Sequence, residues 1–317
     1  MIKIDNLVKT YGKKTVVNSI SFEVKKGEVV GFLGPNGAGK TTTMNILTGY
    51  ISSDSGKVTV DGFDILENPD EVKKRIGYLP ELPPLYFEMT VSEYLNFVYD
   101  LKKASDSVSE PRDEHIRKIL NAIHIDHVSG RLIKNLSKGY KQRVGIAQAL
   151  IGNPEVLILD EPTVGLDPKQ IIEIRNLIGE LKSEHTIILS SHVLPEVSAI
   201  CERVIIINEG NIVAEDTPEE LSRKFIGNRY SVSVCGETVK LNALLSAASY
   251  ITHFELNGEN DGVVKYSVVF DGDSVVSRSR LFDDFVMIGA KIIELTPIDM
   301  TLEELFVKLT AKDNREV

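Results

Sequence analysis

The segment VVGFLGPNGAGKTTT, residues 29–43, decides the fold class of this chain of 317 residues. Val29–Leu33 is a short continuous apolar run, which is typical of a strand buried on both faces of a parallel sheet. A glycine-rich turn follows at once, and Lys40–Leu47 is a helical stretch that ends at Gly49. A strand, a GxxxxGK[ST] loop and a helix in this order predict a phosphate-binding loop in an α/β domain.

The residue types of this loop suit a nucleoside triphosphate. Glycines let several backbone N–H groups point inward, which forms an anion site at the start of a helix. We expect Lys40 to contact the β- and γ-phosphates and the Thr41 hydroxyl to ligate Mg²⁺. A glycine-rich turn that matches by chance is the alternative, and the flanking strand and helix disfavour it. The residues expected to bind the nucleotide are Gly34, Pro35, Asn36, Gly37, Ala38, Gly39, Lys40, Thr41 and Thr42.

A second apolar run, VLILDEP at residues 156–162, ends in two adjacent acids. Successive strand residues face opposite sides, so Asp160 and Glu161 cannot have the same role. We expect Asp160 to face the phosphate loop and hold Mg²⁺, and Glu161 to polarise an attacking water as a general base. A solvated acidic turn is the alternative, and it is weakened by the phosphate loop in the same chain.

The periodicity of the chain predicts a large domain over residues 1–226. Apolar runs at 156–159 and 186–189 flank a helical stretch, which predicts a βαβ crossover and parallel strands. Between about residues 90 and 150 the apolar period is helical, with one helix expected over 113–127. This region is a helical insert between two strand-rich blocks.

A smaller α+β domain is predicted over residues 227–317. The apolar patterns after Gly227 follow the order βαββαβ of a ferredoxin-like unit. A capping box at Thr301 and Glu304 predicts a final helix. Regulation, dimerisation and ligand binding all stay open for this domain, because a fold alone does not give a function.

Composition narrows the class of protein. The formal net charge of −10 argues against nucleic-acid binding driven by overall charge. Cys201 and Cys235 are too few for a disulfide framework or a zinc cluster, so we expect reduced thiols. The N-terminus does not resemble a signal peptide, and no apolar run approaches the roughly 20 residues that cross a bilayer. We expect a cytoplasmic protein unless a partner holds it at a membrane.

The stretch LSKGYKQR, residues 136–143, resembles the signature motif of ATP-binding-cassette (ABC) ATPases. Over residues 1 to about 225, the motifs follow one another in the order that is typical of this family. They are the phosphate loop, the helical insert, the signature, the acidic strand end, a D-loop at Gly165–Asp167 and His192. The resemblance implies a P-loop cassette with a RecA-like α/β core, an antiparallel β subdomain and a helical subdomain.

In this family ATP and Mg²⁺ are sandwiched in a homodimer or heterodimer. The resemblance implies that Ser137 and Gly139 meet the γ-phosphate held by the opposite subunit, although the residues alone favour an ordinary N-cap serine. It likewise implies that Asp167 contributes to the nucleotide site, that His192 contacts the γ-phosphate, and that Tyr11 stacks on adenine. A surface histidine and a packing tyrosine are the alternatives.

Two departures from the family pattern are informative. Glu81 stands where the family usually has glutamine, and its carboxylate could still ligate Mg²⁺ or orient water. Lys138 and Tyr140 stand where glycine and glutamine are commonest. Together with LEELFVKL at residues 302–309, they resemble the type-two exporter subfamily, which includes GldA-like and CcmA-like ATPases and whose transmembrane protein is a separate chain.

The resemblance implies the ATPase subunit of an ABC transporter, expected to be an exporter. The subunit would sit at the cytoplasmic face of the membrane through a separate permease. The apolar loop Leu82–Phe87 would receive a helix of that permease, although packing on its own domain is as well supported.

A non-transport ABC ATPase acting on ribosomes or DNA is the rival, disfavoured by the single phosphate loop and the absence of heptads. A regulator without turnover is disfavoured by Glu161 and His192.

Overall fold

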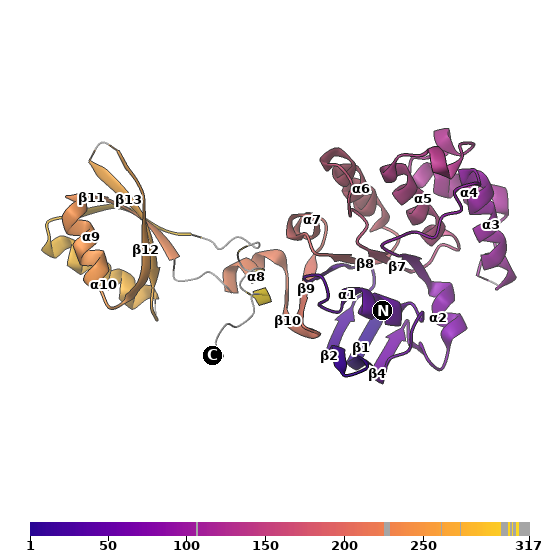
Figure 1. Ribbon diagram of the computed structural model, residues 1–317, viewed down its shortest axis with the longest axis horizontal. Helices are drawn as coiled ribbons and strands as arrows, with labels where there is room; N and C mark the ends of the chain where they lie inside the picture. The colour runs from indigo at the N-terminus through magenta and orange to yellow at the C-terminus, as the bar shows by residue number, and fades with distance from the viewer. Residues whose placement is uncertain are drawn as a thin grey trace. The chain divides into compact units, whose positions relative to one another are not determined.

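The computed structural model describes residues 1–105, 107–224, 229–260, 262–272, 274–298, 304, 306, 309 and 310. It contains two compact units (Figure 1): unit 1 comprises residues 1–218 and 306–317, and unit 2 comprises residues 219–305. This division differs from the predicted domains. The predicted boundary at residue 226 lies outside the described residues, and the end of the chain groups with unit 1 rather than with the smaller domain.

A six-stranded sheet forms the centre of unit 1. Its strands, in spatial order, are β10 (Asn211–Asp216), β9 (Arg203–Asn208), β3 (Val29–Leu33), β8 (Thr186–Ser191), β7 (Val156–Asp160) and β6 (Ile76–Leu79). All neighbours pair in parallel except β10 and β9. β3, β7 and β8 are buried along their whole lengths, because both faces of the sheet are covered, and this explains their continuous apolar sequences.

Helices connect the parallel strands. The helix α6 (Pro168–Leu181) joins β7 to β8, which confirms the predicted βαβ crossover. The phosphate loop leads from β3 into α1 (Lys40–Leu47), at the predicted residues. The shorter helices of unit 1 are α2 (Pro69–Arg75) and α7 (Leu194–Ser198). The helix α8 (Pro218–Lys224) has its first residue in unit 1 and the others in unit 2.

An antiparallel sheet packs beside this centre. Its strands, in spatial order, are β2 (Lys14–Val24), β1 (Ile2–Tyr11), β4 (Ser55–Val60) and β5 (Phe63–Asp64). Alternate residues of β1 and β2, such as Ile4 and Phe22, share one apolar core with Phe32 of β3 and Met44 of α1. The two sheets therefore hold α1 between them, and the phosphate loop starts from a fixed place.

Three helices form the helical subdomain, which gathers at one end of unit 1 in Figure 1: α3 (Val91–Ala104), α4 (Arg112–Ala122) and α5 (Lys138–Leu150). The expected single helix over 113–127 is wrong in its last third. The chain leaves the helix at Ile123, His124 adopts a positive φ of 57°, and a 3₁₀ turn follows at Asp126–Val128. Ile123 and Ile125 are both fully buried by this turn, which a continuous helix would not allow on one face.

Unit 2 has the predicted ferredoxin-like topology. Its elements are β11 (Arg229–Cys235), α9 (Thr238–Ala247), β12 (Ile251–Asn260), β13 (Val263–Phe270), α10 (Ser274–Met287) and β14 (Lys291–Pro297). The sheet order is β12-β13-β11-β14, with every neighbour antiparallel, and the two helices lie on one face (Figure 1). Thr301 of the predicted final helix lies outside the described residues, whereas Phe306, Leu309 and Thr310 are helical.

No helix in the described ranges is both long enough and apolar enough for a membrane span.

A glycine sets the distance between α5 and the sheet. A Cβ atom built on Gly77 of β6 would lie 2.1 Å from the carbonyl oxygen of Ala149 in α5. Because that contact is to backbone, α5 can lie against β6 only when residue 77 has no side chain.

We expect Gly77→Ala to lower the free energy of unfolding by about 1–3 kcal/mol, because the helix must move away from the sheet. Gly179 is a matched control in α6, where a Cβ atom meets nothing within 4 Å. There Gly179→Ala should raise stability by about 0.5–1 kcal/mol. The midpoint of urea unfolding measures both changes, and equal stability of Gly77→Ala and the parent chain would contradict the packing described.

Candidate functional site

A cavity of about 470 Å³ lies over the loop between β3 and α1, and we call it the phosphate-loop cavity. It is lined by Val16, Asn36, Gly37, Gly39, Lys40, Thr41, Thr42, Glu81, Glu161, Val164 and His192. Residues from five separate stretches of the sequence therefore meet here. Four of these stretches follow the carboxyl ends of the parallel strands β3, β6, β7 and β8, where ligands bind in open α/β sheets.

The glycines of the loop are required by its packing. Gly39 has a φ of 112°, and a Cβ atom there would lie 2.6 Å from the carbonyl oxygen of Val16. A Cβ atom on Gly34 would lie 2.4 Å from the carbonyl oxygen of Ile207. The loop is therefore pressed against β2 and β9, which fixes the direction of its backbone N–H groups.

Lys40 is held inside the loop. Its Nζ donates to the carbonyl oxygens of Gly34 at 2.8 Å and Pro35 at 3.4 Å, and it lies 3.3 Å from Glu161 Oε1. The side chain is only 6% exposed. A buried ammonium at the start of a helix adds positive charge where the loop N–H groups already favour an anion.

Asp160 is fully buried at the end of β7. The Ser190 hydroxyl donates to its Oδ1, while Oδ2 is buried with no hydrogen-bond partner in the described chain. Burial raises the pKa of Asp160, the charges of Glu161 and Glu81 add to this, and interactions with Ser190 and Thr41 oppose it. An unpaired carboxylate oxygen beside a threonine hydroxyl fits a hard divalent cation such as Mg²⁺, which would also stabilise the ionised form.

The side chain of Glu161 has different partners from the side chain of Asp160. Its backbone is left-handed, with a φ of 49°, and its N–H donates to the carbonyl oxygen of Ser190 at 3.2 Å. Its Oε2 lies 2.9 Å from Nδ1 of His192. A non-glycine residue in this conformation is a strained position of the kind found at functional sites. The side chains of Lys40, Glu161 and His192 thus form one chain of polar contacts along the cavity.

The signature and D-loop residues form a second cluster, which we call the signature cluster. Ser137 is the N-cap of α5 and accepts from the N–H of Tyr140 at 3.4 Å. Asp167 caps α6 and accepts from the N–H of Gln170 at 2.9 Å. A Cβ atom on Gly139 would lie 2.9 Å from Cδ of that same Gln170, so the two helix starts are in contact.

The structure therefore separates the predicted site residues into two groups. Ser137, Gly139 and Asp167 are all described, and none of them lines the phosphate-loop cavity. Tyr11 does not line it either, and its side chain is 51% exposed at the end of β1, which disfavours the packing alternative. Every other predicted residue lies in the phosphate-loop cavity or in the loop and strand end that bound it.

Three residues of the site were not predicted from the sequence: two that line the phosphate-loop cavity and one that supports its acidic residues. Val16 and Val164 look like ordinary apolar residues, and no sequence signal marks them as part of a site. Ser190 supports Asp160 and Glu161. The polar run Ser190–His192 at the end of an apolar strand was a signal that could have identified it.

Sequence comparisons place the chain among known proteins. The family model "ABC transporter" matches residues 17–164. The bacitracin transport ATP-binding protein BcrA of Bacillus licheniformis is 35% identical over 312 residues, which covers 98% of this chain and 97% of BcrA. The lantibiotic transport ATP-binding protein SrtF of Streptococcus pyogenes is 40% identical over 229 residues, which covers 71% of this chain and 96% of SrtF.

Solved structures agree with these sequences. The ATP-binding subunit of an ABC transporter superposes with a TM-score of 0.62 at 29% identity, covering 71% of this chain and 93% of that one. A dimeric post-hydrolysis state of an ATP-binding cassette with ADP and Pi superposes with a TM-score of 0.61 at 26% identity, covering 68% of this chain and 98% of that one. The chain therefore belongs to the ABC transporter family, as an ATP-binding subunit that hydrolyses ATP.

Proposed function

We propose that this chain works as a head-to-tail dimer that powers export through a separate transmembrane protein. The observation that carries this proposal is the separation of the phosphate-loop cavity from the signature cluster. An anion site at the N-terminus of α5 is complete only if a triphosphate is presented to it from another subunit. The dimeric form of a related cassette supports this arrangement.

The residues of the phosphate-loop cavity suit hydrolysis of a γ-phosphate. The loop N–H groups and Lys40 bind and orient the phosphates and offset their charge. Glu161 accepts a proton from a water that attacks the γ-phosphorus, while the bond from that phosphorus to the β–γ bridging oxygen breaks and leaves ADP and phosphate. His192, hydrogen-bonded to Glu161, positions this water and the γ-phosphate.

Mg²⁺ would be held by Thr41, Asp160 and Glu81, and when bound it would neutralise charge on the phosphates. The described part of the chain has no group of three or more His, Cys, Asp or Glu side chains suited to a metal ion. Such a group is unnecessary here, because Mg²⁺ in phosphate sites is bound by one or two carboxylates and by the substrate itself.

The partner-facing surface is proposed to lie at the loop after Glu81. Leu82, Tyr86 and Phe87 are 84%, 53% and 51% exposed, while Leu85 is buried. The ring of Tyr86 packs at 5.5 Å on Phe97 and at 6.0 Å on Tyr94 of α3. The loop thus packs partly on its own domain and still presents aromatic surface, which suits a helix of a membrane protein at the cytoplasmic face.

Export is the proposed direction of transport. The names of BcrA and SrtF associate those proteins with transport of bacitracin and of a lantibiotic. The lipopolysaccharide export protein LptB of Haemophilus influenzae is 34% identical over 241 residues, covering 73% of this chain and 99% of LptB. These relatives support an exporter, and they leave the transported compound open.

Replacing Glu161 by glutamine removes the proton acceptor and keeps the size of the side chain. We expect the rate of ATP hydrolysis to fall about 100-fold or more and ATP-bound dimers to accumulate. Glu155→Gln is the matched control, since Glu155 precedes the opposite end of β7 and, among the described residues, forms an ion pair with the exposed Lys26 at 3.6 Å. Phosphate release measures the rate, and full turnover by Glu161→Gln would exclude Glu161 as the base.

Ser137→Ala tests the role of the signature cluster. In the Glu161→Gln background we expect it to weaken the ATP-dependent dimer at least about tenfold, because one γ-phosphate contact is lost. Thr90→Ala is the control: Thr90 caps α3 with a full capping box, so its loss costs a similar ~1 kcal/mol of stability. Light scattering after gel filtration reports the dimer. Equal weakening by both variants would show that only capping had been measured.

Replacing both Tyr86 and Phe87 by alanine should remove aromatic docking surface. We expect transport driven by the complex to be lost, while the isolated chain still hydrolyses ATP, because neither side chain lines the phosphate-loop cavity. Transport in reconstituted vesicles and phosphate release from the isolated chain are measured side by side. Lost hydrolysis with intact partner binding would contradict the placement.

A further inference from the structure

Lys138 is the first residue of α5 and stands between Ser137 and Gly139 of the signature cluster. A lysine is unfavourable at this place, because the N-terminus of a helix carries a partial positive charge. The first turn of α5 contains no acidic residue that would offset the added cation. Helix stability therefore does not account for Lys138, and exceptions of this kind to local rules are expected at functional sites.

Two neighbouring cations of the same stretch are paired, whereas Lys138 is not. Lys134 pairs with Glu88 at 2.6 Å. Arg143 pairs with Glu173 at 3.1 Å. Among the residues that the structure describes, no acidic side chain forms an ion pair with Lys138, which is exposed. Its charge is therefore available to an anion from outside this chain.

The ammonium group of Lys138 lies against the D-loop. A Cβ atom built on Gly165 would lie 2.1 Å from Nζ of Lys138, so the amine lies directly over the backbone of Gly165. Asp167, the acid of the same cluster, accepts from the N–H of Gln170 and caps α6. The positive charge is thus placed at the starts of both helices, where the signature cluster faces away from its own phosphate-loop cavity.

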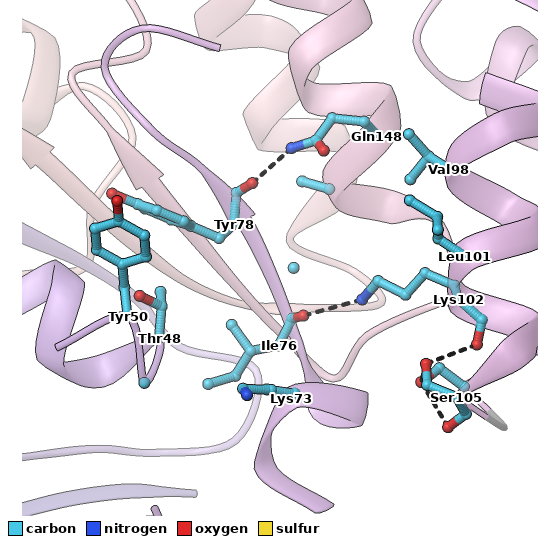
Figure 2. Close-up of a pocket in the computed structure, with 14 residues that line it drawn as sticks. Thr48, Tyr50, Lys73, Ile76, Tyr78, Val98, Leu101, Lys102, Ser105 and Gln148 are labelled. Atoms are coloured by element: carbon cyan, nitrogen blue, oxygen red, sulfur yellow. Dashed lines mark hydrogen bonds between the residues drawn. The ribbon is translucent and has the colours of Figure 1, made fainter. Parts of the chain in front are cut away.

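The helix that carries Lys138 is anchored at its other end. Nε2 of Gln148 donates to the carbonyl oxygen of Tyr78 in β6 at 2.7 Å, as Figure 2 shows. The missing side chain of Gly77 lets Ala149 lie directly against the same strand. α5 therefore holds Lys138 at a fixed position relative to the central sheet, as a preorganised site requires.

The phosphate-loop cavity has few positive charges for the ligand that it binds. Glu81 and Glu161 line it, and Lys40 is the one lysine or arginine among its described lining residues. Lys40 already lies 3.3 Å from Glu161. Glu81 also stands where the family usually has neutral glutamine. A further cation at the γ-phosphate would offset this negative charge, and in the proposed dimer the signature cluster of the other subunit faces that place.

We propose that Lys138 contacts the γ-phosphate of the ATP held by the opposite subunit and is a further catalytic residue of this chain. The ammonium group would donate to a γ-phosphate oxygen and stabilise the charge on it while the bond to the bridging oxygen breaks. The inference rests on the proposed head-to-tail dimer. It adds a side-chain contact that glycine, the family's commonest residue at this position, does not offer.

Neutral and charged replacements of Lys138 measure this contribution. We expect Lys138→Met to lower the rate of ATP hydrolysis at least about tenfold, because one charge-assisted contact to phosphate is lost. Lys138→Arg should keep most of the rate, because it keeps the charge. Lys134→Met is the control, since Lys134 is exposed and pairs with Glu88. Phosphate release measures all three rates.

Stability distinguishes a lost contact from a damaged fold. The urea midpoint of Lys138→Met should equal or exceed that of the parent chain, because a cation has been removed from a helix N-terminus. Parental hydrolysis by Lys138→Met, or equal losses in Lys138→Met and Lys138→Arg, would overturn the inference.

Mixing shows in which subunit Lys138 acts. Lys40→Ala has a defective phosphate loop and an intact signature cluster, whereas Lys138→Met has an intact phosphate loop. Their mixed dimer contains one site in which an intact loop faces an intact Lys138. We expect its rate per intact loop to match that of a mixture of Lys40→Ala with Ser137→Arg, which forms the same site.

The outcomes separate the inference from the proposed function. If Lys40→Ala restores hydrolysis to Ser137→Arg but does not raise the rate of Lys138→Met, the inference is wrong and the shared site stands. If neither mixture regains hydrolysis, the proposed head-to-tail dimer and the inference are both wrong.

Discussion

The close approach of the phosphate loop to its neighbouring strands is the constraint on which the rest of the site depends. The backbone at Gly34 and Gly39 lies so close to carbonyl oxygens of β9 and β2 that a Cβ atom on either glycine would collide with them. The loop therefore has one shape, and its N–H groups and Lys40 point in one direction. Glu161 and His192 come from two other strand ends and act on that same place, so the parallel sheet gives the site its geometry.

The structure could be predicted from the sequence wherever a local pattern of residues determined it. The buried strand, the loop and α1 occur at the predicted residues, because apolar runs and glycine spacing act over short distances. The prediction of one continuous helix over 113–127 failed where tertiary packing dominated, because the turn at His124 buries two isoleucines. Val16 carried no signal at all, since any β-branched residue would fit the same strand pattern.

One helix connects the surfaces on which the proposed cycle depends. The N-terminus of α5 carries Ser137, and Gln148, near its other end, donates to the carbonyl oxygen of Tyr78 in β6, the strand that leads to Glu81. Its thirteen residues span about 20 Å as a single rigid element. Gly77 holds this helix directly against β6. The proposed closure of a dimer on ATP and the proposed docking of a membrane partner would therefore act on the same piece of secondary structure.

In the proposed dimer, each ATP is held by the phosphate loop of one subunit and the signature cluster of another. Mixing two inactive variants, Lys40→Ala and Ser137→Arg, tests it most directly. A mixed dimer has one site built from an intact loop and an intact signature helix, so the account predicts that ATP hydrolysis returns on mixing. A mixture as inactive as either variant alone would contradict a site shared between subunits.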